Sequence, residues 1–392
     1  MSTELYSRLF EADPHPAYEE LRRESPVRPI ALPTGATGWL VTRYDDVRQA
    51  LTDPRLSKGG MLSPVGFRPP LPEAARAALT QHVLTVDPPD HSRLRRLVSA
   101  AFTARRTEAL RPRVQEITDG LLDGMAGREQ VDLIDELAFP LPIQVICELV
   151  GVPLADRASF RHWSNIVVSG QLTDENVPAA FLALLGYVRE LTAAKRAEPA
   201  DDLLSDLIAV SDEGDRLTGD ELTSMVFLLL IAGHETTVNL IGNGAYLLLT
   251  HPDQRDRLRA EPDLLPAAIE EFLRYESPVQ VATHRVTTAD VDLGGAVIPA
   301  GHTVVVSLLS ANRDEARFPD PTRFDIARRD SGHVAFGHGI HYCLGAPLAR
   351  LEGQIALGTL LRRYPEMGLA DDKIDWRPGV LMHGLARLPV TL

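Results

Sequence analysis

A glycine-rich turn that carries one cysteine and runs directly into an apolar helix constrains this chain more than any other feature. The segment from Phe336 to Gly345 reads Phe-Gly-His-Gly-Ile-His-Tyr-Cys-Leu-Gly, and a helix is predicted to follow over 346–352. Its glycines indicate positive φ, or close approach to a flat, bulky group. A helix start beside the Cys343 sulfur stabilises the thiolate, which is a good ligand for iron. The alternative is a buried structural cysteine.

The composition fits one large globular domain. Of the 392 residues, 44% are hydrophobic, which is enough for a sizeable core. No internal repeat or long linker marks a boundary, so we predict a single domain over residues 1–392. Only two cysteines occur, Cys147 and Cys343, which excludes a disulfide framework and fits a reducing compartment. Cys147 lies in an apolar run and is expected to be buried.

Charge and hydropathy exclude two classes of partner. The N-terminus lacks the features of a signal peptide, and the longest apolar run, 225–233, is too short to span a bilayer. We therefore predict a cytoplasmic protein that does not bind membranes. The net charge of −14 argues against nucleic-acid binding. Between His91 and Arg113, however, seven arginines accompany one acidic residue. That segment is either a docking face for an acidic partner or an ordinary solvated helix face.

The pattern of elements predicts a mainly α fold with small β-sheets. An early β element is expected over 27–42, and helices are expected from about 93 to 195. The sequence from Thr218 to Glu221 has the pattern of a capping box, and a long helix should follow it to about Thr250. A shorter helix is predicted over 266–275, strands over 291–309, and a final strand over 384–392. The Pro- and Gly-rich stretch 59–81 is expected to be a mobile loop.

The long predicted helix carries an unusual polar group at its centre. Ala232-Gly233-His234-Glu235-Thr236-Thr237 interrupts an otherwise apolar surface. Glycine inside a helix costs about 1 kcal/mol relative to alanine, and glutamate is rarely buried without a partner. One interpretation is a ligand beside Gly233, with Glu235 and Thr236 relaying protons. The other is that Gly233 permits close helix packing while Glu235 and Thr236 face water.

A second group of charges is expected to be structural. Glu271 and Arg274 lie three apart on one predicted helix face, and Arg323 stands in a segment made rigid by prolines. A glutamate that holds both guanidinium groups would form a buried, hydrogen-bonded cluster.

Four further donors suit a ligand that bears two carboxylates. His91 and Arg95 are four apart and share a helix face, while Arg285 and His341 lie far along the chain. Each alone is more commonly a surface residue. Together they would suit a dianionic cofactor.

Taken together, these motifs resemble a bacterial cytochrome P-450, a haem-thiolate monooxygenase, over about 18–392. The Phe-x-x-Gly-x-x-x-Cys-x-Gly pattern of that family matches Phe336, Gly339, Cys343 and Gly345. Its Ala-Gly-x-Glu-Thr stretch matches 232–236, and its Glu-x-x-Arg pair matches 271–274, with Arg323 as the implied third member. The sequence around Gly233 is most similar to that of actinobacterial macrolide-tailoring and vitamin D-hydroxylating members.

The resemblance implies a fold, a cofactor and partners. A long central helix would lie over haem b (iron protoporphyrin IX), with Cys343 as the axial iron ligand and Glu235 and Thr236 delivering protons during oxygen activation. The resemblance also implies a monomer that inserts one oxygen atom into a lipophilic small molecule, with electrons from ferredoxin and ferredoxin reductase, since the chain has no flavin or nicotinamide fingerprint. Residues implied to contact the cofactor are His91, Arg95, Ala232, Gly233, Arg285, Phe336, Gly337, His341 and Cys343.

Three other readings remain at this point. A peroxygenase of the same fold would use peroxide directly and need no acid–alcohol pair. A haem-thiolate sensor would bind haem without catalysis. His338, His341 and Cys343 could instead supply three of the four ligands of a zinc site.

Overall fold

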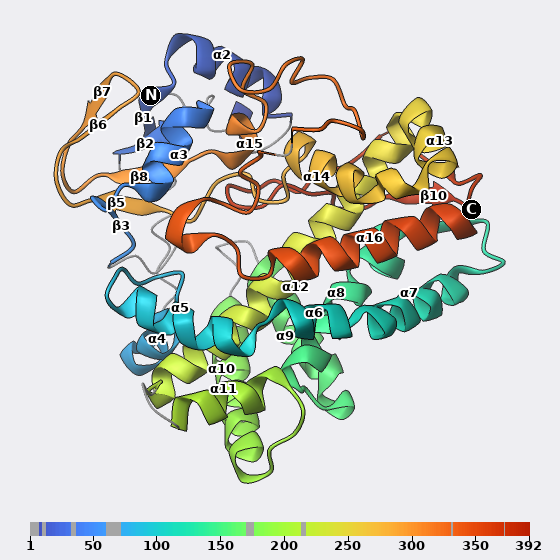
Figure 1. Ribbon diagram of the computed structural model, residues 1–392. Coiled ribbons are helices and arrows are strands. Elements are labelled where there is room, and N and C mark those ends of the chain that lie inside the picture. Colours follow the sequence, from blue (N-terminus) through green and yellow to red (C-terminus); the bar gives the residue numbers. More distant parts are fainter. Residues whose placement is uncertain are drawn as a thin grey trace. The chain divides into compact units, whose positions relative to one another are not determined.

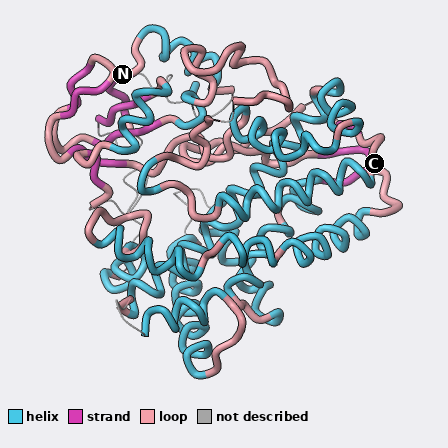
Figure 2. Tube along the Cα trace, in the orientation of Figure 1, coloured by secondary structure: helices cyan, strands magenta, loops and turns pink. Residues whose placement is uncertain are grey.

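The computed structural model describes residues 8–9, 13–32, 37–59, 72–169, 176–212, 217–330, 332–371 and 373–392. Helices make up most of the described chain and the strands are short (Figure 2), which confirms the mainly α prediction. Contacts divide the chain into two compact units, each built from separate segments. Unit 1 comprises 1–57, 110–141 and 236–392, and unit 2 comprises 58–109 and 142–235. The single domain over 1–392 stays a prediction.

The described strands all belong to unit 1 and form three small sheets. In the largest, β2 pairs with β8 in parallel although more than 250 residues separate them, and the predicted β element over 27–42 forms β1 and β2. The turn between β1 and β2 lies outside the described residues at 33–36. The strands of the largest sheet are, in order, β1 (Val27–Ala31), β2 (Thr37–Val41), β8 (Thr303–Val306), β5 (Arg285–Thr287) and β3 (Leu56–Ser57). The second sheet has the order β4 (Gln130–Asp132), β10 (Pro389–Thr391) and β9 (Gly368–Leu369). The third pairs β6 (Val291–Leu293) with β7 (Ala296–Ile298).

The β6–β7 hairpin shows why glycine is needed at its turn. Gly294 and Gly295 both have positive φ, 55° and 81°, a conformation that favours glycine over other residues. The apolar faces of this hairpin and of the largest sheet share one core with α3, whose members include Val47, Val291 and Val304. Hydrophobic alternation in the strands therefore fixes which face of each is buried.

Helix α3 packs against the largest sheet and against β6, and α16 (red in Figure 1) packs along α7. Helix α14 coincides with the helix predicted over 266–275. The helices are α2 (His15–Glu24), α3 (Tyr44–Thr52), α7 (Arg111–Met125), α13 (Pro252–Ala260), α14 (Leu265–Tyr275), α15 (Leu308–Ala311) and α16 (Ala346–Arg363), with the π-helix η1 (Ile134–Ala138) and the short 3-10 helices η3 (Pro262–Leu264) and η4 (Gly339–His341).

The described part of unit 2 is helical. Helix α10 packs against α9, and α11 packs against α5. The prediction of a loop over 59–81 is wrong for its last part, because Glu73–Thr80 forms α4. This helix buries Ala75 and Ala78 against Leu185. Residues 60–71 lie outside the described chain. The helices are α4 (Glu73–Thr80), α5 (Asp90–Ala101), α6 (Ala104–Ala109), α9 (Arg157–Ser169), α10 (Val177–Ala197) and α11 (Leu203–Asp212), with the turn η2 (Leu154–Asp156).

Two helices, α8 (Pro140–Val150) and α12 (Gly219–Thr250), contribute residues to both units. The predicted capping box begins α12. The Thr218 N–H donates to Glu221 Oε2 at 2.8 Å, and the Glu221 N–H donates to Thr218 Oγ1 at 3.1 Å. These reciprocal bonds satisfy two N–H groups that a helix start otherwise leaves without partners.

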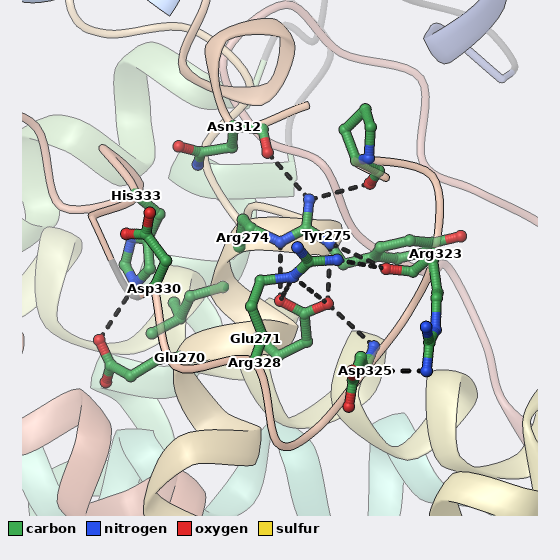
Figure 3. Close-up of polar contacts among 12 residues, drawn as sticks. Glu270, Glu271, Arg274, Tyr275, Asn312, Arg323, Asp325, Arg328, Asp330 and His333 are labelled. Carbon is green, nitrogen blue, oxygen red and sulfur yellow. Dashed lines mark hydrogen bonds and ion pairs between the residues drawn. The ribbon is translucent and has the colours of Figure 1, made fainter. Parts of the chain in front are cut away.

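The predicted charge cluster is present in unit 1, with one member changed (Figure 3). Arg274 donates to both oxygens of Glu271, at 2.7 and 2.8 Å, and both side chains are almost fully buried. The second guanidinium on Glu271 belongs to Arg328, whose Nε lies 3.2 Å from Oε2. We call Glu271, Arg274 and Arg328 the Glu271 cluster.

Arg323 is therefore not the third member, and the expectation from the family pattern is wrong on this residue. Its side chain is 67% exposed and lies 3.6 Å from Asp325 (Figure 3). What Arg323 contributes is its backbone carbonyl, which accepts from Arg274 and from Arg328. Sequence alone could not separate Arg323 from Arg328, because both lie in the same irregular segment.

This geometry predicts that replacing Arg328 destabilises the protein and that replacing Arg323 changes its stability little. Arg328→Gln removes a guanidinium that contacts Glu271 and the carbonyls of Pro319, Asp320 and Arg323. We expect it to lower the free energy of unfolding by about 1–3 kcal/mol, because the buried Glu271 carboxylate loses one of its two guanidinium donors. The matched variant Arg323→Gln should change it by no more than about 0.5 kcal/mol. Denaturant unfolding of both variants measures this, and equal losses would contradict the assignment.

Candidate functional site

The cysteine loop belongs to unit 1 and places Cys343 just before α16. The Cys343 N–H donates to the Phe336 carbonyl at 2.9 Å, which closes the loop. Gly337 and Gly339 each have a φ of 75°, so the predicted positive-φ glycines are confirmed at two of three positions. Cys343 is exposed, whereas Cys147 is buried, and burial raises the pKa of the Cys147 thiol to about 12. Of the two cysteine sulfurs, the one in the loop is therefore the accessible one.

Gly339 is required by packing as well as by conformation. A Cβ there would lie 2.9 Å from Thr52 Cγ2 and 3.3 Å from the Leu51 carbonyl oxygen, at the end of α3. Beside it, His338 Nε2 lies 3.2 Å from an Arg48 nitrogen, also on α3, so this histidine nitrogen already has a donor. The contact counts against the zinc reading of the loop, which needs His338 as a ligand. Helix α3 thus holds the loop at its glycine and at its histidine.

The sulfur lies close to the first turn of α16. A Cβ built at Gly345, the N-cap, would come within 3.9 Å of Cys343 Sγ. The 18 residues of α16 direct their N–H groups and dipole toward this end, which favours the thiolate over the thiol. The donor set fits the haem that the resemblance implies, since an exposed thiolate in a glycine-lined loop is a soft ligand for iron.

A second ionic group fixes the loop to its supporting helices. Arg350 of α16 donates to both oxygens of Glu270 on α14, at 2.6 and 2.8 Å, and His333 Nε2 lies 3.1 Å from the same carboxylate (Figure 3 draws the His333 contact). The Arg350 guanidinium also lies over the Phe336 ring, 4.5 Å from its centroid. We call Glu270, Arg350 and His333 the Glu270 cluster. It connects α14, α16 and the chain entering the cysteine loop.

Sequence reasoning missed the Glu270 cluster. A usable signal was present, because Glu270 precedes Glu271 and so faces a different side of α14. Burial alone raises the pKa of the Glu270 carboxyl, but hydrogen bonds from Arg350 and His333 outweigh burial and hold that pKa at about 2. The carboxylate is therefore ionised throughout the neutral and mildly acidic range.

The central motif of α12 agrees with the packing interpretation at Gly233 but not at Glu235, and the ligand interpretation stays a prediction. The helix continues without a break through Gly233, where a Cβ would lie 2.8 Å from Ile146 Cδ1 in the same unit, so Gly233 does permit close packing. Glu235, however, is only 4% exposed and does not face water. Within the fully described stretch 221–249, Ala232 is the one exposed residue. Leu229, Ala232 and Thr236 follow at helical spacing, so one narrow face of α12 is less covered than the rest.

The four expected donors are divided between the units. Arg285, on β5, and His341, on η4, belong to unit 1, and His91 and Arg95, both on α5, belong to unit 2. Arg285 is buried and donates to the Thr283 and Leu51 carbonyls at 3.3 and 3.4 Å. His91 is also buried, and burial with the nearby Arg95 lowers its pKa. Their joint contact with a cofactor stays a prediction.

The arginine-rich segment is partly neutralised by acids of the chain itself. Arg93 pairs with Glu221 and Arg106 pairs with Asp206 within unit 2, and Arg113 lies 2.7 Å from Glu116. These pairs favour the solvated-face interpretation for three of the seven arginines. Arg96 and Arg105 are exposed and remain candidates for a docking face.

Glu270→Gln tests the Glu270 cluster through the pH dependence of the unfolding free energy. The folded pKa of about 2 lies below the ordinary value of 4.5, so the carboxylate stabilises the fold fully above pH 4.5 and loses this effect as the pH falls toward 2. We expect the variant to lose about 1–3 kcal/mol of unfolding free energy at neutral pH. The difference from the wild type should shrink below pH 4.5.

Glu366→Gln is the matched control, because that side chain is 88% exposed. Denaturant unfolding from neutral pH down to about pH 3 measures both variants. A loss for Glu270→Gln that does not change with pH would contradict the assigned role of the carboxylate.

Comparison with known proteins agrees with the motifs. The cytochrome P450 family model matches residues 184–367. The chain is 52% identical to vitamin D(3) 25-hydroxylase of Pseudonocardia autotrophica, over 99% of the chain and 96% of that protein. It is 52% identical to the cytochrome P450 monooxygenase PikC of Streptomyces venezuelae, over 97% and 91%. The tirandamycin C-bound P450 monooxygenase TamI superimposes with a TM-score of 0.89 at 46% identity, over 98% of both chains.

The chain is therefore about half identical to these relatives over nearly its whole length. It also carries the cysteine loop at the start of α16 and the Ala-Gly-x-Glu-Thr stretch of α12. The chain belongs to the cytochrome P450 family, and it is a haem-thiolate monooxygenase.

Proposed function

We propose that this monooxygenase hydroxylates or epoxidises a bulky lipophilic small molecule of the macrolide, polyketide or steroid class. The observation that carries the proposal is the exposed Cys343 sulfur at the start of α16. The less covered face of α12, with Leu229 and Ala232, supplies apolar contacts of the kind that line small-molecule pockets. Relatives whose names specify vitamin D3 and tirandamycin C support a large, mostly apolar substrate.

The cofactor of this proposal is haem b. Cys343 would hold its iron, Phe336 and Gly337 would line the loop beneath it, and Ala232 and Gly233 would approach it from α12. The two carboxylates would be held by His91, Arg95, Arg285 and His341. When bound, the group supplies the redox chemistry that activates dioxygen. The glycine-rich loop and the exposed Ala232 support this placement, because small residues let a flat group approach the backbone.

The role of the chain in the reaction is to place protons. Thr236 would hold one at its Oγ1, and the Glu235 carboxyl would resupply it. Glu235 is buried and Thr236 is partly buried, so bulk water has restricted access to this part of α12. An acid–alcohol pair of this kind serves dioxygen rather than peroxide, which already carries its protons. This distinction favours the monooxygenase over a peroxygenase.

Electrons would come from a ferredoxin and its reductase, as P450s of this kind use external redox partners. The exposed Arg96 and Arg105 would contribute to a face of this protein on which an acidic partner docks. We further propose a cytoplasmic monomer. Two described helices, α10 and α12, are long and apolar enough to cross a membrane by length and composition. Of the α12 window, 67% is buried inside the structure, as expected for a core helix.

Thr236→Ala tests the proton-placing role. We expect product formed per electron pair to fall by roughly tenfold or more, with matching release of hydrogen peroxide, because the hydroxyl no longer holds a proton. Thr236→Ser keeps a hydroxyl and should retain most of the coupling. The measurement is product and peroxide yield with a reduced ferredoxin, using a substrate found by spin-state titration of macrolides, polyketides and steroids.

Three outcomes decide between the alternative functions. Unchanged coupling in Thr236→Ala would remove this residue from the proton path. Turnover by the wild type with added peroxide, but not with any reduced ferredoxin, would favour the peroxygenase. Haem binding and spin-state shifts without oxygen consumption would favour a sensor.

A further inference from the structure

A cluster of two histidines and a glutamate lies in unit 1 apart from the cysteine loop. His15 begins α2, Glu276 directly follows α14, and His383 lies near the C-terminus. His15 Nε2 lies 3.0 Å and His383 Nε2 lies 2.7 Å from the same oxygen, Glu276 Oε2. One ligand atom from each residue lies within 4.8 Å of the others. We call these three residues the His15 cluster.

The spacing and chemistry of the His15 cluster suit a transition-metal ion. Zinc takes imidazole nitrogen at about 2.0–2.1 Å and carboxylate oxygen at about 2.0–2.2 Å, which puts neighbouring ligand atoms of a tetrahedron about 3.3 Å apart. The observed 3.0 and 2.7 Å need only a small opening to reach that value. Two histidines and one glutamate are also a known zinc-binding combination that leaves a fourth position for water.

Neighbouring side chains fix each ligand. The Trp376 ring stacks on His383, with centroids 4.3 Å apart and an interplanar angle of 12°, and the His15 ring meets His383 edge-on. Asn243 of α12 donates to the backbone carbonyls of both Glu276 and His383, at 3.2 and 3.0 Å. The three ligands are therefore preorganised although they come from distant parts of the sequence.

Arg313 holds one of the two carboxylate oxygens of Glu276. Its guanidinium donates to Glu276 Oε1 at 2.6 Å, and it is held by the Tyr275 carbonyl at 2.9 Å and by the Tyr275 ring beneath it. Oε2 is the oxygen that both imidazoles contact, whereas Oε1 lies 3.2 Å from His15 Nε2 and also accepts from Arg313, so Oε2 is the oxygen placed to coordinate an ion between the two histidines. A positive neighbour weakens the binding of a cation, so a site of moderate affinity is expected.

A cavity gives an ion access to the cluster. It has a volume of about 520 Å³, and His15, Glu276 and His383 all line it, together with Arg313, Tyr246 and His251. A hydrated ion can therefore reach the nitrogens without unfolding, and water can occupy the fourth position.

We propose that His15, Glu276 and His383 form a zinc-binding site that joins the start of α2 to the C-terminal segment. None of these residues contributes to the haem site proposed above. Because a metal ion that binds only the folded chain stabilises it, the expected role is structural.

The test uses the untagged, haem-loaded protein and zinc alone. Equilibrium dialysis followed by elemental analysis, with haem iron as the internal standard, should give one zinc per chain, and the thermal midpoint should rise with zinc. His15→Gln and His383→Gln should each lower the affinity at least about tenfold and remove the thermal shift. The matched control is His251→Gln, which removes another histidine from the same cavity and should bind zinc like the wild type.

Two results would overturn the proposal. One is a wild type that binds no zinc and shows no thermal shift. The other is zinc binding that survives in both His15→Gln and His383→Gln, which would place the ion elsewhere. The haem spectrum of each variant confirms that it has folded, so failure of this proposal is distinguishable from failure of the haem assignment.

Discussion

The candidate site depends on holding one exposed sulfur, that of Cys343, at the start of a long helix. The dipole of α16 favours the thiolate, and the bond from the Cys343 N–H to the Phe336 carbonyl closes the loop that presents it. Positive φ at Gly337 and Gly339 makes this loop possible, and contact with α3 leaves no room for a side chain at Gly339. A small shift in these backbone positions would change where the sulfur is presented.

Two adjacent glutamates on α14 hold different parts of the chain around the cysteine loop. Glu271 is buried and holds Arg274 and Arg328, which in turn bind carbonyls of the irregular segment at 319–323. Glu270 holds Arg350 of α16 and His333, just before the cysteine loop. Successive helix residues point about 100° apart, so one turn of α14 can fix both the irregular segment and the loop. Buried charges of this kind are costly unless fully paired, which explains why each carboxylate has more than one donor.

Local signals predicted the parts of this protein whose geometry is local. The capping box at Thr218, the length of α12 and the helix at 265–275 follow from spacing within one turn or one face. The choice of Arg328 over Arg323, and the pairing of Glu270 with Arg350, depend on how an irregular segment and two helices meet, which no periodicity encodes. The helix at 73–80 was missed because proline and glycine before it outweighed its own alanines. The His15 cluster joins residues more than 350 positions apart, and only tertiary structure could reveal it.

We propose that Cys343 supplies the thiolate ligand of the haem iron. The most direct measurement is the spectrum of the reduced, carbon monoxide-bound protein for the wild type, Cys343→Ala and the control Cys147→Ala. We expect a thiolate-ligated spectrum for the wild type and for Cys147→Ala, and its loss in Cys343→Ala. A wild-type spectrum from Cys343→Ala at the same haem content would contradict the assignment.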